Sequence, residues 1–269
     1  MPRQLVPIIF ITDTMSCIVE KFSHFIALTP EEVDTLKHLE KEECAYKKRE
    51  VIFSQDRQVE NLYVIKEGLA ISYCEHSDGG RIVLNFHFPG DLVNAMTLGL
   101  GESPYSLMAV TDSVLCPFPK AGFSELFSQS ARLTSLIYAF GMLDNTVLID
   151  RLRAIGRMSA ENRLALLILQ IHARLNLFSD HETLEFDAPI SQEIMADAVG
   201  LTPVYVNRIL SNFREQGLLS FRSRRVVIHD KAALLAMSEF KDRYYNLDIS
   251  WLPREGVAAE DNIDRKQSH

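Results

Sequence analysis

Residues 192–210 carry the pattern that most limits how this chain can fold. Two helices that cross at close range need a small residue at the crossing, and Ala196 supplies it. Four residues later the chain must turn sharply, which Gly200 allows because it can adopt a left-handed backbone conformation. Thr202 can cap a second helix, and Pro203 fits the first turn of that helix, where no amide donor is lost. The segment therefore predicts a helix-turn-helix.

The helical register divides the second of these helices into an inner and an outer face. Val206 and Ile209 point back onto the first helix, which begins after the capping residue Ser191. The other positions lie on different faces, several of them outward: Val204, Tyr205, Asn207, Arg208 and Ser211. A generic helical hairpin would show the same register, so the pattern alone does not establish a DNA-binding function.

Local charge favours DNA binding over a generic hairpin. Residues 201–231 hold six basic and two acidic side chains, a balance of +4. The whole chain carries −8, so the remainder carries −12. Three of the arginines, Arg222, Arg224 and Arg225, lie in an expected hairpin directly after the helices, as the wing of a winged helix would. Because affinity for DNA depends largely on neutralised phosphates, a localised basic segment matters more than the net charge.

The first half of the chain has a different character. Residues 45–120 contain short apolar runs separated by turn sequences such as 77–80 and 89–91. The clearest run, with Ile82, Leu84, Phe86 and Phe88, alternates as a strand with one buried face does. Many short strands at this spacing indicate an antiparallel sandwich or roll.

Helical patterning replaces these strands after about residue 120. Residues 123–157 contain no proline and predict a helix about 40 Å long with a 4,3-spaced apolar stripe. Such a stripe suits packing on the helix's own domain as well as pairing with a second copy. The stripe consists of Leu136, Phe140, Leu143, Val147 and Ala154.

Residues 159–240 are predicted to be helical with one hairpin and a loop over 178–189. The tail from residue 245 is predicted to be poorly ordered apart from Trp251 and Leu252.

Several function classes lack support. The four cysteines, at positions 17, 44, 74 and 116, form no CxxC pair, which disfavours a disulfide scaffold and a zinc ribbon. No apolar run approaches the roughly 18 residues needed to cross a bilayer, and the N-terminus lacks a clear secretory signal. No Ser/His/Asp set, phosphate loop or HExxH motif is present. We therefore expect a soluble cytoplasmic protein that is not an enzyme and that holds neither a metal nor a cofactor.

In this order, a roll, a long helix and a winged helix-turn-helix resemble the CRP/FNR family of bacterial transcription regulators. The likeness spans residues 25–235 and includes the segments 62–68 and 109–113 and the turn Pro89-Gly90-Asp91. It implies an α+β fold with a cyclic-nucleotide-binding-like β-roll, or jelly roll, at the N-terminal end. The implied divisions are an N-terminal extension (1–24), the sensor roll (25–128), a dimerisation helix (129–158), the winged helix-turn-helix (159–235) and a C-terminal tail (236–269).

The resemblance implies a homodimer whose two recognition helices enter successive major grooves of a pseudo-palindrome, about 34 Å apart. In this arrangement Arg208 could pair with guanine, and the apolar stripe of the long helix would form the dimer interface. Where many members place Arg-Glu before this arginine, the chain has Pro203-Val204, so the usual operator is in doubt. The implied DNA-binding residues are Gln192, Thr202, Tyr205, Asn207, Arg208, Ser211, Arg222, Arg224 and Arg225.

The effector of such a roll is left open by the residues. Cyclic-nucleotide binders place Gly-Glu after the Pro-Gly-Asp turn and Arg-Ser farther on, and here these places hold Asn94-Ala95 and Tyr105-Ser106. Cyclic AMP is therefore not expected, and neither a haem histidine nor clustered N-terminal cysteines are present. An unidentified small molecule and RNA polymerase are the further partners that the resemblance admits. The alternatives are a metabolite receptor whose winged domain contacts another protein, and a cyclic-nucleotide-dependent enzyme subunit, which would need a catalytic segment.

Overall fold

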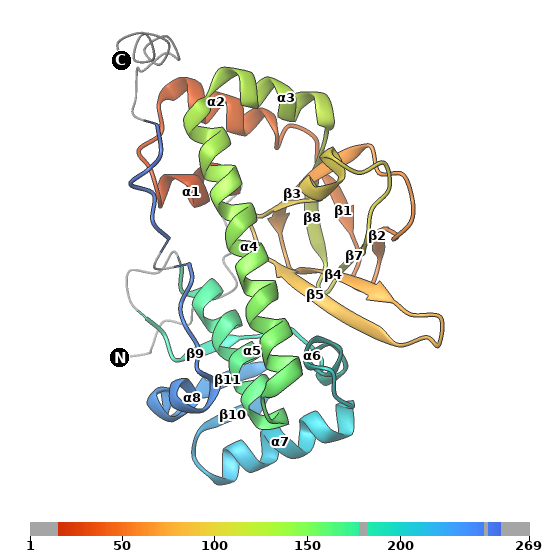
Figure 1. The fold of residues 1–269 in the computed structure, drawn as a ribbon, viewed down its shortest axis with the longest axis vertical. Helices are drawn as coiled ribbons and strands as arrows, with labels where there is room; N and C mark the ends of the chain where they lie inside the picture. Colours follow the sequence, from red (N-terminus) through yellow and green to blue (C-terminus); the bar gives the residue numbers. More distant parts are fainter. Residues whose placement is uncertain (1–15, 178–181, 245–246, 254–269) are drawn as a thin grey trace, which may run out of the picture.

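The computed structural model describes residues 16–177, 182–244 and 247–253. A strand-rich half and a helix-rich half lie along one long helix, α4 (Ala131–Arg157), which runs most of the length of the molecule (Figure 1). The predicted α+β architecture of roll, long helix and helix-turn-helix is confirmed.

Two four-stranded antiparallel sheets form the roll, in the orders β1-β8-β3-β6 and β2-β7-β4-β5. Aromatic and aliphatic side chains fill the space between them, and the ring of Phe53 lies 5.8 Å from that of Tyr63 and 5.7 Å from that of Tyr105. The strands are β1 (Cys44–Tyr46), β2 (Val51–Phe53), β3 (Asn61–Glu67), β4 (Ala70–Glu75), β5 (Arg81–His87), β6 (Leu92–Val93), β7 (Ser106–Ala109) and β8 (Ser113–Pro119), with a 3-10 turn, η1 (Ala95–Leu98), after β6.

Strand β5 departs from the alternation that its sequence predicts. Its pairing with β4 shifts register between Ser72 and Tyr73, which leaves Leu84 as the extra residue of a bulge. As a result Val83, Phe86 and Phe88 share one core, while Leu84 packs toward the core between the two sheets. The prediction of one half-buried face with Ile82 and Leu84 beside Phe86 is therefore wrong.

The long helix predicted over 129–158 is confirmed as α4, and a separate helix precedes it. Ser130 adopts an extended conformation between α3 (Lys120–Gln129) and α4, and its hydroxyl accepts the amide of Leu133, so it ends one helix and caps the next.

The stripe predicted as the dimer interface is buried within the chain itself, because each of its five side chains is 9% exposed or less. Leu136 and Phe140 belong to a core that the roll shares with N-terminal helices, and Leu143 and Val147 contact residues from the C-terminal half. A 4,3 repeat shows that a helix face is covered but not what covers it. The assignment of Leu136, Phe140, Leu143, Val147 and Ala154 to an interface between copies is therefore corrected.

The opposite face of α4 leaves apolar side chains in solvent. Tyr138, Met142, Ile149 and Leu152 are all exposed, Leu152 by 73%. With exposed Asn145 they follow a 4,3,4,3 spacing, the repeat of a two-stranded coiled coil. We call these five residues the exposed stripe.

In its described residues, the C-terminal half contains four helices and a three-stranded sheet in the order β10-β11-β9. The loop predicted over 178–189 contains one of these strands, and its residues 178–181 lie outside the described part of the chain. The elements are α5 (Ala160–Leu175), β9 (Glu185–Asp187), α6 (Gln192–Val199), α7 (Pro203–Glu215), β10 (Leu219–Arg222), β11 (Arg225–Ile228) and α8 (Lys231–Ser238).

The described parts of both terminal segments pack into the core, whereas residues 1–15, 245–246 and 254–269 lie outside the described part of the chain. Helix α1 (Cys17–Ser23), within the predicted extension, buries Ile18 and Phe22 completely, and α2 (Pro30–His38) covers the same core. In the predicted tail, Leu247 and Ile249 pack against that core. The outer face of the sheet containing β4 and β5 shares one continuous core with α5, α6 and α7, so the two halves are fused by apolar packing.

Candidate nucleic-acid interface

Helices α6 and α7 have the local geometry that the sequence predicts. The hydroxyl of Ser191 accepts the amide of Ile194 at 3.2 Å, and Gly200 ends α6 in the left-handed region with φ +65°. The hydroxyl of Thr202 then accepts the amide of Tyr205 at 3.3 Å and starts α7. Because every signal in this turn is local, the helix-turn-helix forms where the sequence places it.

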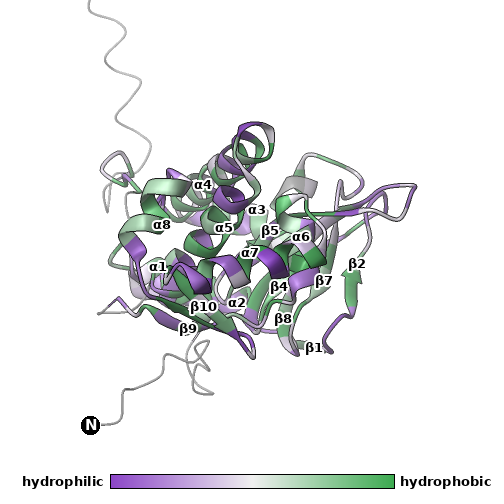
Figure 2. Ribbon diagram, turned by 90° about the horizontal axis from the view of Figure 1, so that it is seen from below, coloured by the Kyte–Doolittle hydropathy of each residue, from purple (hydrophilic) through white to green (hydrophobic). Residues whose placement is uncertain are grey.

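One face of α7 packs into the core, and the opposite face is exposed to solvent. Val206 and Ile209 are buried, as predicted, whereas Val204 is 81% exposed. Figure 2 looks at this end of the molecule and shows hydrophilic and hydrophobic residues interleaved along α7. Asn207 and Arg208 are exposed, and Thr202 is exposed at the start of the helix.

Several of the predicted DNA-binding side chains of α6 and α7 contact one another at the surface. The amide of Gln192, at the start of α6, donates to Oδ1 of Asn207 at 3.1 Å. The guanidinium of Arg208 lies 5.8 Å from the centre of the Tyr205 ring. Ser211 is half-buried one turn farther along. The structure thus joins two pairs of the predicted residues, Gln192 with Asn207 and Arg208 with Tyr205.

The hairpin after α7 forms a wing in which two arginine side chains are exposed to solvent. Its turn residues, Ser223 and Arg224, have φ +50° and +69°, which is the two-residue turn that suits antiparallel strands. Arg222 and Arg224 are exposed. Arg225 instead lies 2.5 Å from the carboxylate of Glu185 on β9. We therefore infer that the main role of Arg225 is to stabilise the three-stranded sheet of the wing.

Two arginines of the roll, which the sequence did not single out, neutralise the acidic side chains of α6. Arg49 lies 3.0 Å from Glu193, and Arg81 lies 2.6 Å from Asp197. No local signal could have indicated these pairs, because the partners are more than 100 residues apart in the chain. Both acidic side chains of α6 are therefore paired with cations of the roll.

The roll offers no charged side chain at the two places where the resemblance would put a cyclic nucleotide. Asn94 is buried with φ +76°, and its Oδ1 has no hydrogen-bond partner. Burial raises the pKa of Tyr105, and the hydroxyl of Ser106 accepts the amide of Gln55 at 2.9 Å.

Burial shifts the pKa of titratable groups within and beside the roll. Burial raises the pKa of the Cys17 and Cys116 thiols to about 12. Burial lowers the pKa of His87 to about 4, and its imidazole contacts the hydroxyl of Ser72 at 3.1 Å. Among the residues that the structure describes, no group of three His, Cys, Asp or Glu side chains could hold a metal ion, and no helix is long and apolar enough to cross a membrane.

Two family models match separate parts of the chain. One describes a cyclic nucleotide-binding domain and matches residues 43–130, which contain the roll. The other describes a Crp-like helix-turn-helix domain and matches residues 162–237.

Relatives with known roles match along most of their length. The anaerobic regulatory protein of Aggregatibacter actinomycetemcomitans is 24% identical over 225 residues, 83% of this chain and 86% of that protein. The fumarate and nitrate reduction regulatory protein of Salmonella typhimurium is 24% identical over 224 residues, 82% of this chain and 88% of that protein.

Solved structures share the fold. FixK2 from Bradyrhizobium japonicum superposes with a TM-score of 0.65 at 24% identity, covering 74% of this chain and 98% of FixK2. A CooA mutant from Carboxydothermus hydrogenoformans superposes with a TM-score of 0.65 at 18% identity, covering 84% of this chain and 97% of CooA.

Proposed function

This chain belongs to the CRP/FNR family of transcription regulators, and from that premise we propose that it binds a pseudo-palindromic operator as a homodimer through α7. The observation that carries the proposal is the exposed group on α7, in which Asn207 and Arg208 are held by Gln192 and Tyr205. The family regulates transcription and does not catalyse a reaction, so none of these residues has a catalytic role.

In the proposed complex, the side chains of α7 divide into those that read bases and those that position the protein. Arg208 donates to N7 and O6 of a guanine, and Asn207 and Tyr205 face the neighbouring bases. Thr202 and Ser211 lie at the edges of α7 and Gln192 lies at the start of α6, where they reach phosphates. Because Pro203 and Val204 carry no polar side-chain atoms, the two positions before Tyr205 contribute shape and apolar contact only.

The wing supplies sequence-independent affinity in this proposal. Arg222 and Arg224 are exposed and reach the DNA backbone, whereas Arg225 remains with Glu185. Each neutralised phosphate steepens the fall of affinity with salt, by a slope of about 0.9 in a plot of log affinity against log salt concentration.

The exposed stripe is the proposed dimer interface. Its apolar members on successive turns would pair with the same residues of a second copy, as in a two-stranded coiled coil. Asn145 lies at the centre of the stripe, where a polar residue fixes the register of such a pair at some cost in stability. This surface replaces the buried stripe that the sequence predicted.

The proposal includes a cytoplasmic location, contact with RNA polymerase and an effector in the roll that is not cyclic AMP. The last point is supported by the uncharged pair Asn94-Ala95 and by the buried Tyr105-Ser106, which offer neither an acid for a ribose nor a cation for a cyclic phosphate.

The decisive experiment is selection of bound sites from random DNA, followed by affinity measurements on the enriched site and on a scrambled one. The wild-type protein should enrich an inverted repeat and lose affinity steeply with salt. Arg208→Ala should bind both sites alike, whereas Arg214→Ala, which removes the same charge from the last turn of α7, should keep the discrimination. A wild-type protein that enriches no motif, or shows no DNA retardation, would contradict the proposal and favour a protein partner for the winged domain.

A further inference from the structure

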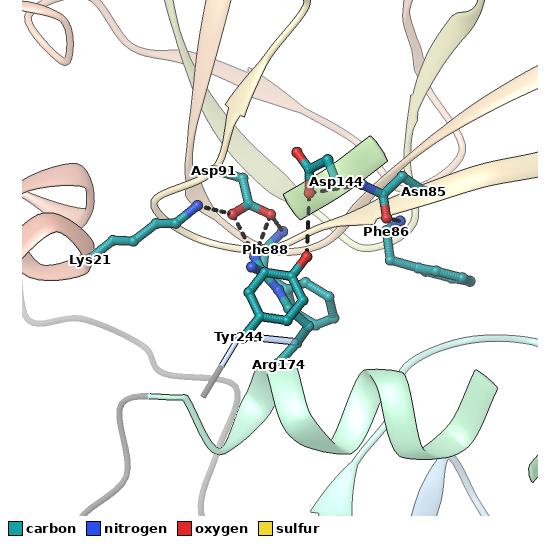
Figure 3. A network of polar contacts seen from close by, with 8 residues as sticks. All are labelled: Lys21, Asn85, Phe86, Phe88, Asp91, Asp144, Arg174 and Tyr244. Carbon is teal, nitrogen blue, oxygen red and sulfur yellow. Dashed lines mark hydrogen bonds and ion pairs between the residues drawn. The ribbon is translucent and has the colours of Figure 1, made fainter. Parts of the chain in front are cut away.

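A buried carboxylate joins the two halves of the molecule. Asp91, in the turn between β5 and β6, lies 2.6 Å from the ammonium of Lys21 on α1. The guanidinium of Arg174 on α5 donates to both of its oxygens, at 2.5 and 2.6 Å, and the amide of Phe88 donates to Oδ2 at 2.8 Å. Figure 3 shows these groups converging on one carboxylate. The three charged side chains are only 6–11% exposed.

Two aromatic rings and a second acid complete the cluster. The guanidinium of Arg174 lies 4.4 Å from the ring centre of Tyr244 and 5.2 Å from that of Phe88. The hydroxyl of Tyr244 donates to Asp144 on α4 at 3.3 Å, and the amide of Asn85 approaches the same oxygen at 3.4 Å. The cluster therefore ties α1, the roll, α4 and α5 to one residue of the C-terminal segment.

That C-terminal segment runs from the helix-turn-helix half back along α4 to the N-terminal helices, as the dark blue chain after α8 shows (Figure 1). Arg243 forms a two-bond ion pair with Asp150 on α4, with both distances 3.0 Å. Beyond Tyr244, Leu247, Ile249 and Leu252 pack against the core beneath α1 and α2. We call Arg243, Tyr244 and residues 247–252 the strap.

The ionic contacts differ in kind from the apolar packing around them. An apolar interface tolerates a small rotation of one layer on another, because the burial energy has no direction. A carboxylate that accepts from Lys21, Arg174 and the Phe88 amide at once has one geometry in which all its bonds form. A rotation of α5 would leave buried charges without partners, which is costly in free energy. The cluster therefore selects one docking angle of the helix-turn-helix half against the roll.

We propose that the Asp91 cluster, closed by the strap, is a latch that fixes the orientation of the helix-turn-helix half relative to α4 and thereby sets the half-site spacing that the dimer accepts. The inference rests on the proposed function, since it takes α4 as the dimer helix and α7 as the recognition helix. With the latch closed, the two recognition helices of a dimer are separated by one distance and one angle. With the latch open, the halves are held by apolar packing and by the ion pairs of α6 with Arg49 and Arg81, and they adapt to more than one spacing.

The test uses the full chain and two readouts, of which one does not involve DNA. Arg174→Met keeps an apolar stem between Phe88 and Tyr244 and removes the buried ion pair with Asp91, while Lys21 still pairs with Asp91. In the Arg174→Met protein, the backbone amides of α5 and β5 should exchange with deuterium about tenfold faster than in the wild type, because local opening governs their exchange. Lys66→Met removes an ion pair that lies within the roll, with Glu43, and should leave the exchange unchanged.

The DNA readout compares the selected operator with versions whose half-sites are one or two base pairs closer or farther apart. Wild-type protein and Lys66→Met should lose most of their affinity on these altered operators, and Arg174→Met should lose much less. On an isolated half-site, all three proteins should discriminate the sequence equally. A folded Arg174→Met protein with wild-type exchange and wild-type spacing preference would overturn the latch.

If Arg174→Met does not fold, substitutions in the strap test the latch instead. Tyr244→Phe removes one hydrogen bond, and Arg243→Met removes a pair whose arginine is one-third exposed, so both should fold. Each should raise exchange in α5 and relax the spacing preference to a smaller degree, and wild-type behaviour of both would overturn the proposal. If the wild-type protein selects no DNA, the proposed function fails, whereas the exchange measurements still confirm or refute the latch.

Discussion

Replacement of Asp91 by Asn tests the electrostatic reasoning behind the interface between the two halves. The amide has nearly the same shape as the carboxylate and can still accept the backbone amide of Phe88, so the turn keeps its form. What changes is the charge: Lys21 and Arg174 remain buried within 2.6 Å of a neutral group. Removal of one partner of a buried ionic group costs about 3–5 kcal/mol, because the remaining charges lose their compensation.

We therefore expect urea unfolding at pH 7 to show the Asp91→Asn protein less stable by about 3–5 kcal/mol. Glu43→Gln is the matched control, since it neutralises the acid of a lysine pair in the same roll at a largely exposed position, and it should cost less than about 1 kcal/mol.

The stability deficit of Asp91→Asn should also shrink between pH 7 and pH 9. Burial already lowers the pKa of Lys21, and Asp91 is the main group that opposes this shift. Without the carboxylate, the folded-state pKa falls further below the value of about 10.4 in the unfolded chain. The folded variant then binds fewer protons than the unfolded one, so its stability rises with pH. A loss no larger than that of Glu43→Gln, or a deficit that grows with pH, would refute the reasoning.

Three further predictions follow from local features of the fold. Gly200→Ala forces a side chain into the left-handed region at φ +65°, where the nearest atom, of Arg163, allows ordinary contact, so calorimetry should show only the backbone cost of about 1–2 kcal/mol. Leu152→Glu should convert the dimer to monomer in sedimentation experiments, because it places a charge in the exposed stripe. Cys17 and Cys116, with pKa values of about 12, should resist iodoacetamide at pH 8 in the folded protein and react after denaturation.

Each of these has a contrary result. An unchanged melting temperature for Gly200→Ala would mean that α6 does not end in the left-handed turn. A Leu152→Glu protein that remains dimeric would place the interface elsewhere, and rapid alkylation of the native thiols would show that the core around α1 opens readily.

The helix-turn-helix could be predicted from the sequence because its signals are local. A capping serine, a small residue, a left-handed glycine and Thr202-Pro203 lie within thirteen residues and determine the backbone whatever surrounds them. The long helix was predicted for the same reason, since an uninterrupted apolar period is visible within its own residues.

What covers each surface could not be predicted, because that depends on residues far apart in the chain. The covered face of α4 was mistaken for a pairing face because its partners include α1 and Tyr244, which no local pattern connects to it. The pairs of Asp91 with Lys21 and Arg174 span 70 and 83 residues. The bulge at Leu84 is likewise invisible in a sequence that alternates regularly.

The most direct test of the account concerns the contact between Arg208 and guanine. In the selected operator, each guanine of a half-site is replaced in turn by 7-deazaguanine, which lacks the N7 acceptor. At one position the wild-type protein should lose affinity equivalent to about 1–3 kcal/mol, and Arg208→Ala should be insensitive to the same replacement. If every replacement weakens both proteins equally, or none weakens the wild type, Arg208 does not read a guanine and α7 is not the recognition helix that we propose.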